Sequence, residues 1–167
     1  AVIEEMDVAH TIYEVPLSLA AEGVDSIILQ YLRLPQTQLH VEQWQRLVER
    51  IKHPADEVTV HVVGKYVEYE DSYKSLNEAM LHGGFAHGLK VNFQWVEAEA
   101  LEEPDGEKLL DAADGILVPG GFGTRGTRGM MKAAEVARTR QVPVFGICYG
   151  FQWATVEFAR NVCGLEG

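Results

Sequence analysis

Positively charged residues are scarce in this sequence, which has 14 Lys and Arg against 25 Asp and Glu and a formal net charge of -11 at pH 7. Proteins that bind nucleic acid through its backbone present clustered Lys and Arg to the phosphates. No basic cluster of that kind occurs along this chain. We therefore expect no nucleic acid among its partners.

Cysteine is rare as well, with Cys148 and Cys163 the only two in 167 residues. Their spacing fits neither a metal site nor a disulfide framework, which favours a reducing, cytoplasmic setting and no bound metal. We expect Cys163 to be an inert packing thiol. No apolar run approaches the roughly 18 residues of a membrane span, and the first residues lack the pattern of a signal peptide. A membrane partner is therefore not expected.

Hydrophobic residues make up 47% of the chain, enough to build a core. Residues 1–57 predict short helices with apolar faces, at 17–24, 27–34 and 41–51. By themselves these residues bury too little surface to be a stable domain. The polar, proline-broken stretch 53–57 marks the domain boundary. A second domain is expected over residues 58–167.

Strand and helix patterns alternate from residue 58 onward. Apolar, β-branched runs predict strands at 58–64, 91–96, 115–118 and 142–145. Helical periodicity predicts helices at 71–85, at 129–139 and from 149 to a stop at Gly164. Alternation with short connections is typical of an α/β fold with a doubly wound, mostly parallel sheet. The acidic stretch 97–107 shows no ligand pattern and predicts a solvated face.

One cysteine lies where the last predicted strand gives way to the last predicted helix. Gly146 and Gly150 flank Cys148 there and leave room for a sharp turn that larger side chains would obstruct. The N-terminus of the following helix favours a thiolate and offers N–H donors to a developing oxyanion. A buried structural cysteine is the alternative, which the flanking glycines disfavour. The pattern therefore predicts a nucleophile elbow.

A second motif, Pro119-Gly120-Gly121-Phe122-Gly123, follows the predicted strand that ends at Val118. Its glycines allow backbone N–H groups to approach a ligand closely, so the loop can hold an anion or an oxyanion. A phosphate-binding loop is a competing interpretation, but the Lys-Ser/Thr of the Walker pattern is absent. A merely structural turn is the other competing interpretation of this loop. Ligands bind doubly wound sheets at the carboxyl ends of the strands, where both motifs are predicted to lie.

Several further short motifs accompany these two, in a definite order along the chain. They are Gly64-Lys65-Tyr66, Asp71-Ser72-Tyr73-Lys74-Ser75, His82-Gly83-Gly84, Arg125-Gly126 and Ala159-Arg160-Asn161-Val162, with Ile12-Tyr13-Glu14-Val15-Pro16-Leu17 upstream. Together they resemble the class I glutamine amidotransferases and, within that class, the CTP synthase family. The upstream segment resembles the end of that family's synthetase, or amidoligase, domain. The resemblance thus implies a class I amidotransferase sheet, incomplete in this chain, after the end of a synthetase domain and a helical linker.

Members of this family convert UTP to CTP with ATP and with ammonia that a glutaminase domain releases from glutamine, a step of pyrimidine nucleotide biosynthesis. By this resemblance Cys148 attacks the side-chain amide of L-glutamine and forms a glutamyl thioester. Gly121 and Tyr149 would supply the N–H groups of the oxyanion hole. The resemblance assigns the glutamine pocket to Gly121, Tyr149, Gly150, Phe151 and Gln152.

The resemblance also implies partners beyond this stretch of chain. ATP and Mg²⁺ are expected in the synthetase domain, most of which is missing here, together with UTP, and the full-length protein is expected to be a homotetramer. GTP is the family's allosteric activator of glutamine hydrolysis. We expect Arg125 on the GTP side, where a guanidinium can meet phosphate oxygens bidentately. An exposed, solvated charge is the other interpretation of Arg125.

The general base of this family, a histidine in a His-Pro-Glu motif far beyond the cysteine, has no counterpart in this sequence. We therefore expect a fragment that does not complete the reaction alone. Tyr149 and Phe151 stand where the family commonly has leucine and methionine. In the segment after the glycine loop, Arg128 inverts a charge that the family commonly has, and Met130 removes one. A non-catalytic α/β binding module with a pocket closed by the two aromatic residues is the alternative. A different amidotransferase of the same class is a third interpretation, which the upstream segment 12–17 disfavours.

Overall fold

The structure is a computed structural model that describes residues 2–4, 6–65 and 70–166, with the side chains of residues 70 and 71 also outside the description. Tyr66, part of one motif above, lies outside the described residues. The chain divides into two compact units. The helical unit comprises Ala1–Asp56 with Gly83–Lys90, and the sheet unit comprises Glu57–His82 with Val91–Gly167.

The helical unit confirms the three helices expected near the start of the chain. Its elements are the 3-10 helix η1 (Ile12–Glu14), α1 (Val15–Ala21), α2 (Val24–Tyr31) and α3 (Glu42–Lys52). A capping box starts the first of them. The Thr11 hydroxyl accepts from the Tyr13 N–H at 3.4 Å, and the Glu14 carboxylate accepts from the Thr11 N–H at 3.3 Å. Pro16 then lies in the first turn of α1, where its missing N–H costs nothing.

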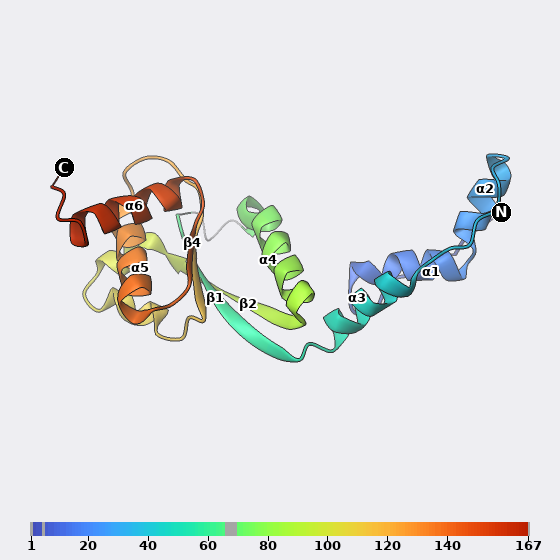
Figure 1. The fold of residues 1–167 in the computed structure, drawn as a ribbon, viewed down its shortest axis with the longest axis horizontal. Helices are drawn as coiled ribbons and strands as arrows, with labels where there is room; N and C mark the ends of the chain where they lie inside the picture. Colours follow the sequence, from blue (N-terminus) through green and yellow to red (C-terminus); the bar gives the residue numbers. More distant parts are fainter. Residues whose placement is uncertain (1, 5, 66–69, 167) are drawn as a thin grey trace. The chain divides into compact units, whose positions relative to one another are not determined.

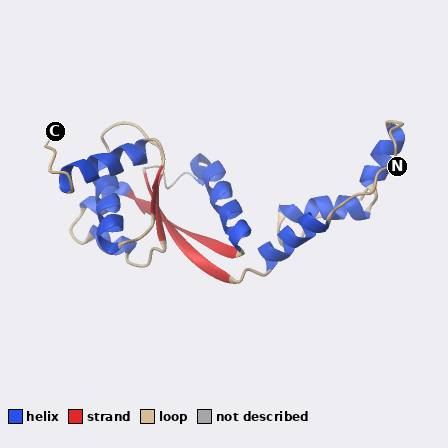
Figure 2. Ribbon diagram, in the orientation of Figure 1, coloured by secondary structure: helices blue, strands red, loops and turns tan. Residues whose placement is uncertain are grey.

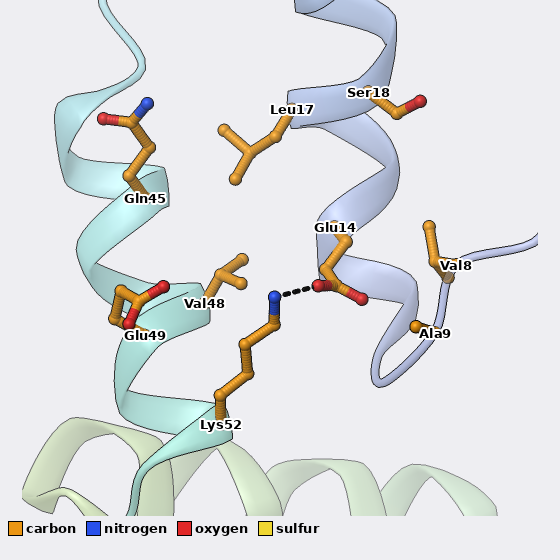
Figure 3. Close-up of a pocket in the computed structure, with 9 residues that line it drawn as sticks. All are labelled: Val8, Ala9, Glu14, Leu17, Ser18, Gln45, Val48, Glu49 and Lys52. Carbon is orange, nitrogen blue, oxygen red and sulfur yellow. Dashed lines mark ion pairs between the residues drawn. The ribbon is translucent and has the colours of Figure 1, made fainter.

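An ion pair joins α3 to the start of the helical unit. The Lys52 ammonium pairs with the Glu14 carboxylate at one end of an open groove of about 690 Å³, and Figure 3 shows the two side chains directed at each other. The Glu14 carboxylate also accepts from the His10 N–H at 3.0 Å. These hydrogen bonds lower the pKa of Glu14 from 4.5 to about 2, and the bond from Lys52 has the largest effect.

Glu14→Gln is expected to change how the helical unit responds to acid. Because the folded pKa is depressed, the ion pair contributes its full stability above the unfolded pKa of 4.5 and loses it as the pH falls toward about 2. Helical circular dichroism followed across this window should therefore show a shallower acid transition in the variant. Glu22→Gln, at an exposed residue in the C-cap position of α1, is the control and should show the same acid transition as the parent chain. An unchanged transition in Glu14→Gln would contradict the assignment.

The sheet unit contains a sheet of four strands in the order β2-β1-β3-β4. Figure 2 draws the strands in red and the helices in blue. The strands are β1 (Asp56–Gly64), β2 (Leu89–Glu97), β3 (Gly115–Val118) and β4 (Val144–Gly146). β3 pairs in parallel with β1 on one side and with β4 on the other. In the second of these pairs Val118 lies opposite Gly146, so the ends of β3 and β4 are level. This register places the glycine loop and the cysteine turn at one edge of the sheet.

Helices cover both faces of this sheet (Figure 1). They are η2 (Glu70–Tyr73), α4 (Lys74–His87), η3 (Ala98–Glu102), η4 (Gly106–Leu110), α5 (Thr127–Arg140) and α6 (Tyr149–Asn161). Successive strand residues point to opposite faces. Ile116 and Val118 pack with α5 on one face, whereas Leu117 packs on the other face with side chains that include Leu76 of α4. The doubly wound α/β architecture is therefore confirmed.

A buried ion pair ties α5 to α6. The Glu157 side chain is 3% exposed and accepts from Arg138 Nη2 at 2.6 Å and from Asn161 Nδ2 at 3.1 Å. The hydrogen bond from Arg138 is the main reason that the pKa of Glu157 is lowered. Its contribution to stability is therefore present above the ordinary pKa and disappears as the pH falls through the lowered one. The pair fixes the helix that begins directly after Cys148.

Two expectations from the sequence are wrong. The acidic stretch 97–107 is more than a solvated face, because η3 and η4 form within and beyond it and bury Ala98, Leu101 and Leu110 in the core beside α5. Charged residues lie between the apolar ones there, so the sequence shows no clear helical or strand periodicity. Cys163 is exposed and is not a packing thiol.

Candidate active site

Cys148 lies at a strained turn between β4 and α6. Its backbone has φ 50° and ψ -103°, a conformation that residues other than glycine rarely adopt. It immediately precedes α6, whose first N–H groups lack partners within the helix. The side chain is exposed. The chain thus presents a thiol to solvent at the positive end of a helix.

The two glycines beside the cysteine are required by close packing. A Cβ atom on Gly150 would lie 2.0 Å from the Val118 carbonyl oxygen, and one on Gly146 would lie 2.6 Å from the Phe151 nitrogen. Both distances are far inside van der Waals contact, and in both cases the obstacle is backbone. The expectation that larger residues would obstruct this turn is confirmed.

The glycine loop after β3 lies beside Cys148. The Ile147 N–H donates to the Val118 carbonyl at 2.9 Å, which extends the pairing of β3 and β4 up to the cysteine. A Cβ atom on Gly120 would lie 3.8 Å from the Cβ atom of Cys148. The two motifs that the sequence singled out are therefore neighbours in space, although Gly120 and Cys148 are 28 positions apart in the sequence.

A buried lysine contacts the glycine loop from the end of β1. Lys65 is 3% exposed, and its Nζ donates to the carbonyl oxygens of Phe122 at 2.8 Å and Gly123 at 2.9 Å. Burial is the main cause that lowers the pKa of Lys65, and the Arg125 guanidinium lowers it further. The burial of this lysine could not be predicted from the sequence, because a lysine after a strand is ordinarily solvated.

Arg125 is held by local partners. Its Nη2 donates to the Lys65 carbonyl at 2.6 Å, and its Nη1 pairs with the Glu99 carboxylate at 3.0 Å. The side chain is 55% exposed. Its expected place on the GTP side stays a prediction, and the structure adds that the guanidinium already bridges β1 and η3.

The residues expected to line a glutamine pocket differ in exposure. Gly150 is buried, Gly121 and Tyr149 are half-buried, and Phe151 and Gln152 are exposed. The Tyr149 ring packs edge-on against Trp153 at 5.7 Å between centroids, and its hydroxyl donates to the Gly123 carbonyl. Tyr149 therefore contacts the glycine loop directly, whereas the Phe151 side chain, 63% exposed, is free of the core.

This arrangement suits attack by a thiolate on a carbonyl carbon. A tetrahedral intermediate needs N–H donors where its oxygen becomes negative, and each such donor contributes on the order of 3 kcal/mol. A glycine loop beside a cysteine at a helix N-terminus provides both the nucleophile and candidate donors. Acyl transfer is the reaction class that these groups support.

Gly120→Ala is expected to slow reaction at Cys148 without unfolding the chain. The added methyl would lie 3.8 Å from the Cys148 Cβ and 4.0 Å from the Ile147 oxygen, both ordinary contacts. It would occupy space beside the thiol, and we expect alkylation by a glutamine-like electrophile to slow about tenfold. Gly115→Ala, whose methyl would meet only the Pro143 oxygen at 3.8 Å, is the control. Equal rates in the two variants, measured by intact mass, would contradict this placement of the loop.

Comparison with known proteins identifies the family. The model of the family Glutamine amidotransferase class-I matches residues 68–166. The chain therefore belongs to the class I glutamine amidotransferases. Within that class its similarity is to CTP synthases, and the resemblance expected from the motifs is confirmed.

Three relatives document this similarity. The CTP synthase of Acidobacterium capsulatum is 58% identical over 100% of this chain and 30% of its own length. That of Koribacter versatilis is 55% identical over 99% of this chain and 30% of its own length. The glutaminase domain of Trypanosoma brucei CTPS, solved with bound acivicin, has a TM-score of 0.59 and 40% identity, covering 64% of this chain and 42% of that one. The chain thus spans about a third of the length of the curated relatives it matches.

Two absences among the described residues concern membranes and metal ions. Within the described ranges, no helix is both long and apolar enough to cross a membrane. Among the same residues, His, Cys, Asp and Glu side chains do not gather in groups of three or more that could hold a metal ion.

Proposed function

We propose that this chain carries part of the glutamine-hydrolysing site of a CTP synthase, with Cys148 as the nucleophile. The observation that carries the proposal is the position of Cys148, at a strained turn before α6 and beside Gly120 of the glycine loop. Membership of the class I glutamine amidotransferases and the similarity to a glutaminase domain support it.

The proposed reaction proceeds through a thioester. The Cys148 thiolate attacks the side-chain amide carbon of L-glutamine, and the amide oxygen becomes an oxyanion that accepts from the Gly121 and Tyr149 N–H groups. A protonated general base gives its proton to the amide nitrogen, the oxyanion re-forms the carbonyl as the C–N bond breaks, and ammonia leaves a glutamyl thioester. Water then hydrolyses the thioester and releases glutamate. Gly150, Phe151 and Gln152 complete the proposed glutamine pocket.

The remainder of the proposed activity belongs to a longer protein. Residues 1–57 would be the end of a synthetase domain with a helical linker, and residues 58–167 the first part of the glutaminase domain. ATP-dependent amination of UTP to CTP, the Mg²⁺ that accompanies ATP, activation by GTP near Arg125, and assembly as a cytoplasmic homotetramer are proposed for that protein. A general base is required for turnover, so this chain alone is proposed to be inactive.

Covalent labelling tests the proposal on the chain itself. The chain is incubated with diazo-oxo-norleucine, an electrophile that mimics glutamine, and its intact mass is measured, with Cys148→Ala as the blank. The proposal predicts one adduct on the parent chain and none on the variant. A folded parent chain without an adduct would favour the non-catalytic module, in which Tyr149 and Phe151 close the pocket.

A further inference from the structure

We propose that the side chains of Lys65 and Tyr149 form a clamp that holds the glycine loop (Pro119–Gly123) in the orientation that oxyanion binding requires. The inference rests on the proposed function and adds two positioning residues to it. Neither side chain is proposed to touch the substrate. Their role is to restrict a loop whose glycines would otherwise allow many backbone conformations.

Lys65 fixes two successive peptide groups of the loop. Its ammonium donates to the Phe122 and Gly123 carbonyl oxygens at 2.8 and 2.9 Å, from a side chain that is 3% exposed. In a trans peptide the C=O and the next N–H point in opposite directions. The held carbonyls therefore set the directions of the Gly123 and Thr124 N–H groups, and a flip of either peptide would break a buried hydrogen bond. The Gly121 N–H, the proposed oxyanion donor, is restrained through the two residues that join it to these peptides.

Tyr149 lies next to Lys65 and completes the clamp. Its hydroxyl donates to the Gly123 carbonyl, the same oxygen that Lys65 binds, and its ring lies 4.7 Å from Lys65 Nζ. A cation over an aromatic face is attracted by the ring's electron density. A Cβ atom on Gly121 would lie 3.5 Å from Tyr149 Cδ1 and 3.8 Å from Lys65 Cδ. Gly121 thus lies beside both side chains.

The clamp links the loop to the cysteine through the chain itself. Tyr149 follows Cys148 directly and begins α6, so a side chain that holds Gly123 also fixes the loop relative to the elbow. Arg125 steadies the lysine, because it donates to the Lys65 carbonyl at 2.6 Å. A misplacement of catalytic groups by about 1 Å can cost on the order of a hundredfold in rate, so this restraint bears on reactivity.

Lys65→Met tests the clamp with two independent readouts. Amide hydrogen exchange of the loop, measured by mass spectrometry, should become faster than in the parent chain. The maximal rate of Cys148 labelling by diazo-oxo-norleucine should fall about tenfold, with a smaller change in the half-saturating concentration. Alkylation of Cys148 by iodoacetamide, which needs no oxyanion hole, should stay within about twofold. Lys108→Met, at a lysine 67% exposed on η4, is the matched control.

The outcomes separate this inference from the proposed function. Unchanged exchange and labelling in a folded Lys65→Met chain would overturn the clamp. A parent chain that is not labelled would overturn the proposed function, while the exchange rates would still decide the clamp. If Lys65→Met does not fold, Tyr149→Phe removes only the hydroxyl that binds Gly123, and faster loop exchange in that variant supports the inference whereas unchanged exchange overturns it.

Discussion

Gly150→Ala is expected to destabilise the sheet unit by about 3 kcal/mol or more. The new methyl would lie 2.0 Å from the Val118 carbonyl oxygen and 2.7 Å from its carbonyl carbon. Neither atom belongs to a flexible side chain, so α6 must move away from β3 to make room. Urea denaturation measures the free energy of unfolding, and labelling of Cys148 should be lost with the native turn.

Gly83→Ala provides the control for that substitution. Gly83 also lies in a helix, α4, but a methyl there would meet nothing within 4 Å. Alanine forms helix more readily than glycine, so we expect a gain of about 0.5–1 kcal/mol. Two helical glycines should therefore respond to the same change with opposite signs. A loss of equal size in both variants would contradict the packing described for Gly150.

Cys148→Gly is expected to abolish labelling and to stabilise the fold. A non-glycine residue at φ 50° and ψ -103° stores strain of about 1–3 kcal/mol, which glycine relieves. Glycine also gains more backbone entropy on unfolding, and so the net increase in the free energy of unfolding should be about 1 kcal/mol. Thermal or urea unfolding, together with intact mass after exposure to the electrophile, checks both effects.

Cys148→Ala separates the thiol from the strain. Alanine removes the nucleophile but keeps the Cβ atom, so labelling should be lost without a gain in stability. If the glycine and alanine variants were equally stable, the turn would not be strained. A strained nucleophile is a case in which function opposes stability at one residue.

The sequence was sufficient to predict much of the fold and the position of the cysteine. The alternation of β-branched runs and helical periodicity predicted the doubly wound sheet, and Gly146 and Gly150 predicted the tight turn at Cys148. These signals are local, because they depend on residues adjacent in the chain. Their steric basis appears in the structure as the close approach of Gly150 to Val118.

The parts that could not be predicted depend on distant residues. Lys65 and Gly123 are 58 positions apart, and only the folded sheet brings the ammonium to the loop carbonyl. Tyr149 was expected to add bulk to a pocket, and its hydrogen bond to Gly123 could not be foreseen from spacing. The 3-10 helices η3 and η4 were missed because their buried residues, such as Leu101 and Leu110, lie among charged ones.

Labelling resolved by residue tests the central claim, that Cys148 belongs to a glutamine-recognising site, most directly. Cys148 and Cys163 are both exposed, so Cys163 is an internal control for reactivity that depends on exposure alone. After brief treatment with diazo-oxo-norleucine, peptide mass spectrometry should find the adduct on Cys148 only, and excess L-glutamine but not D-glutamine should slow its formation. Equal labelling of both cysteines, or labelling that L-glutamine does not affect, would contradict the claim.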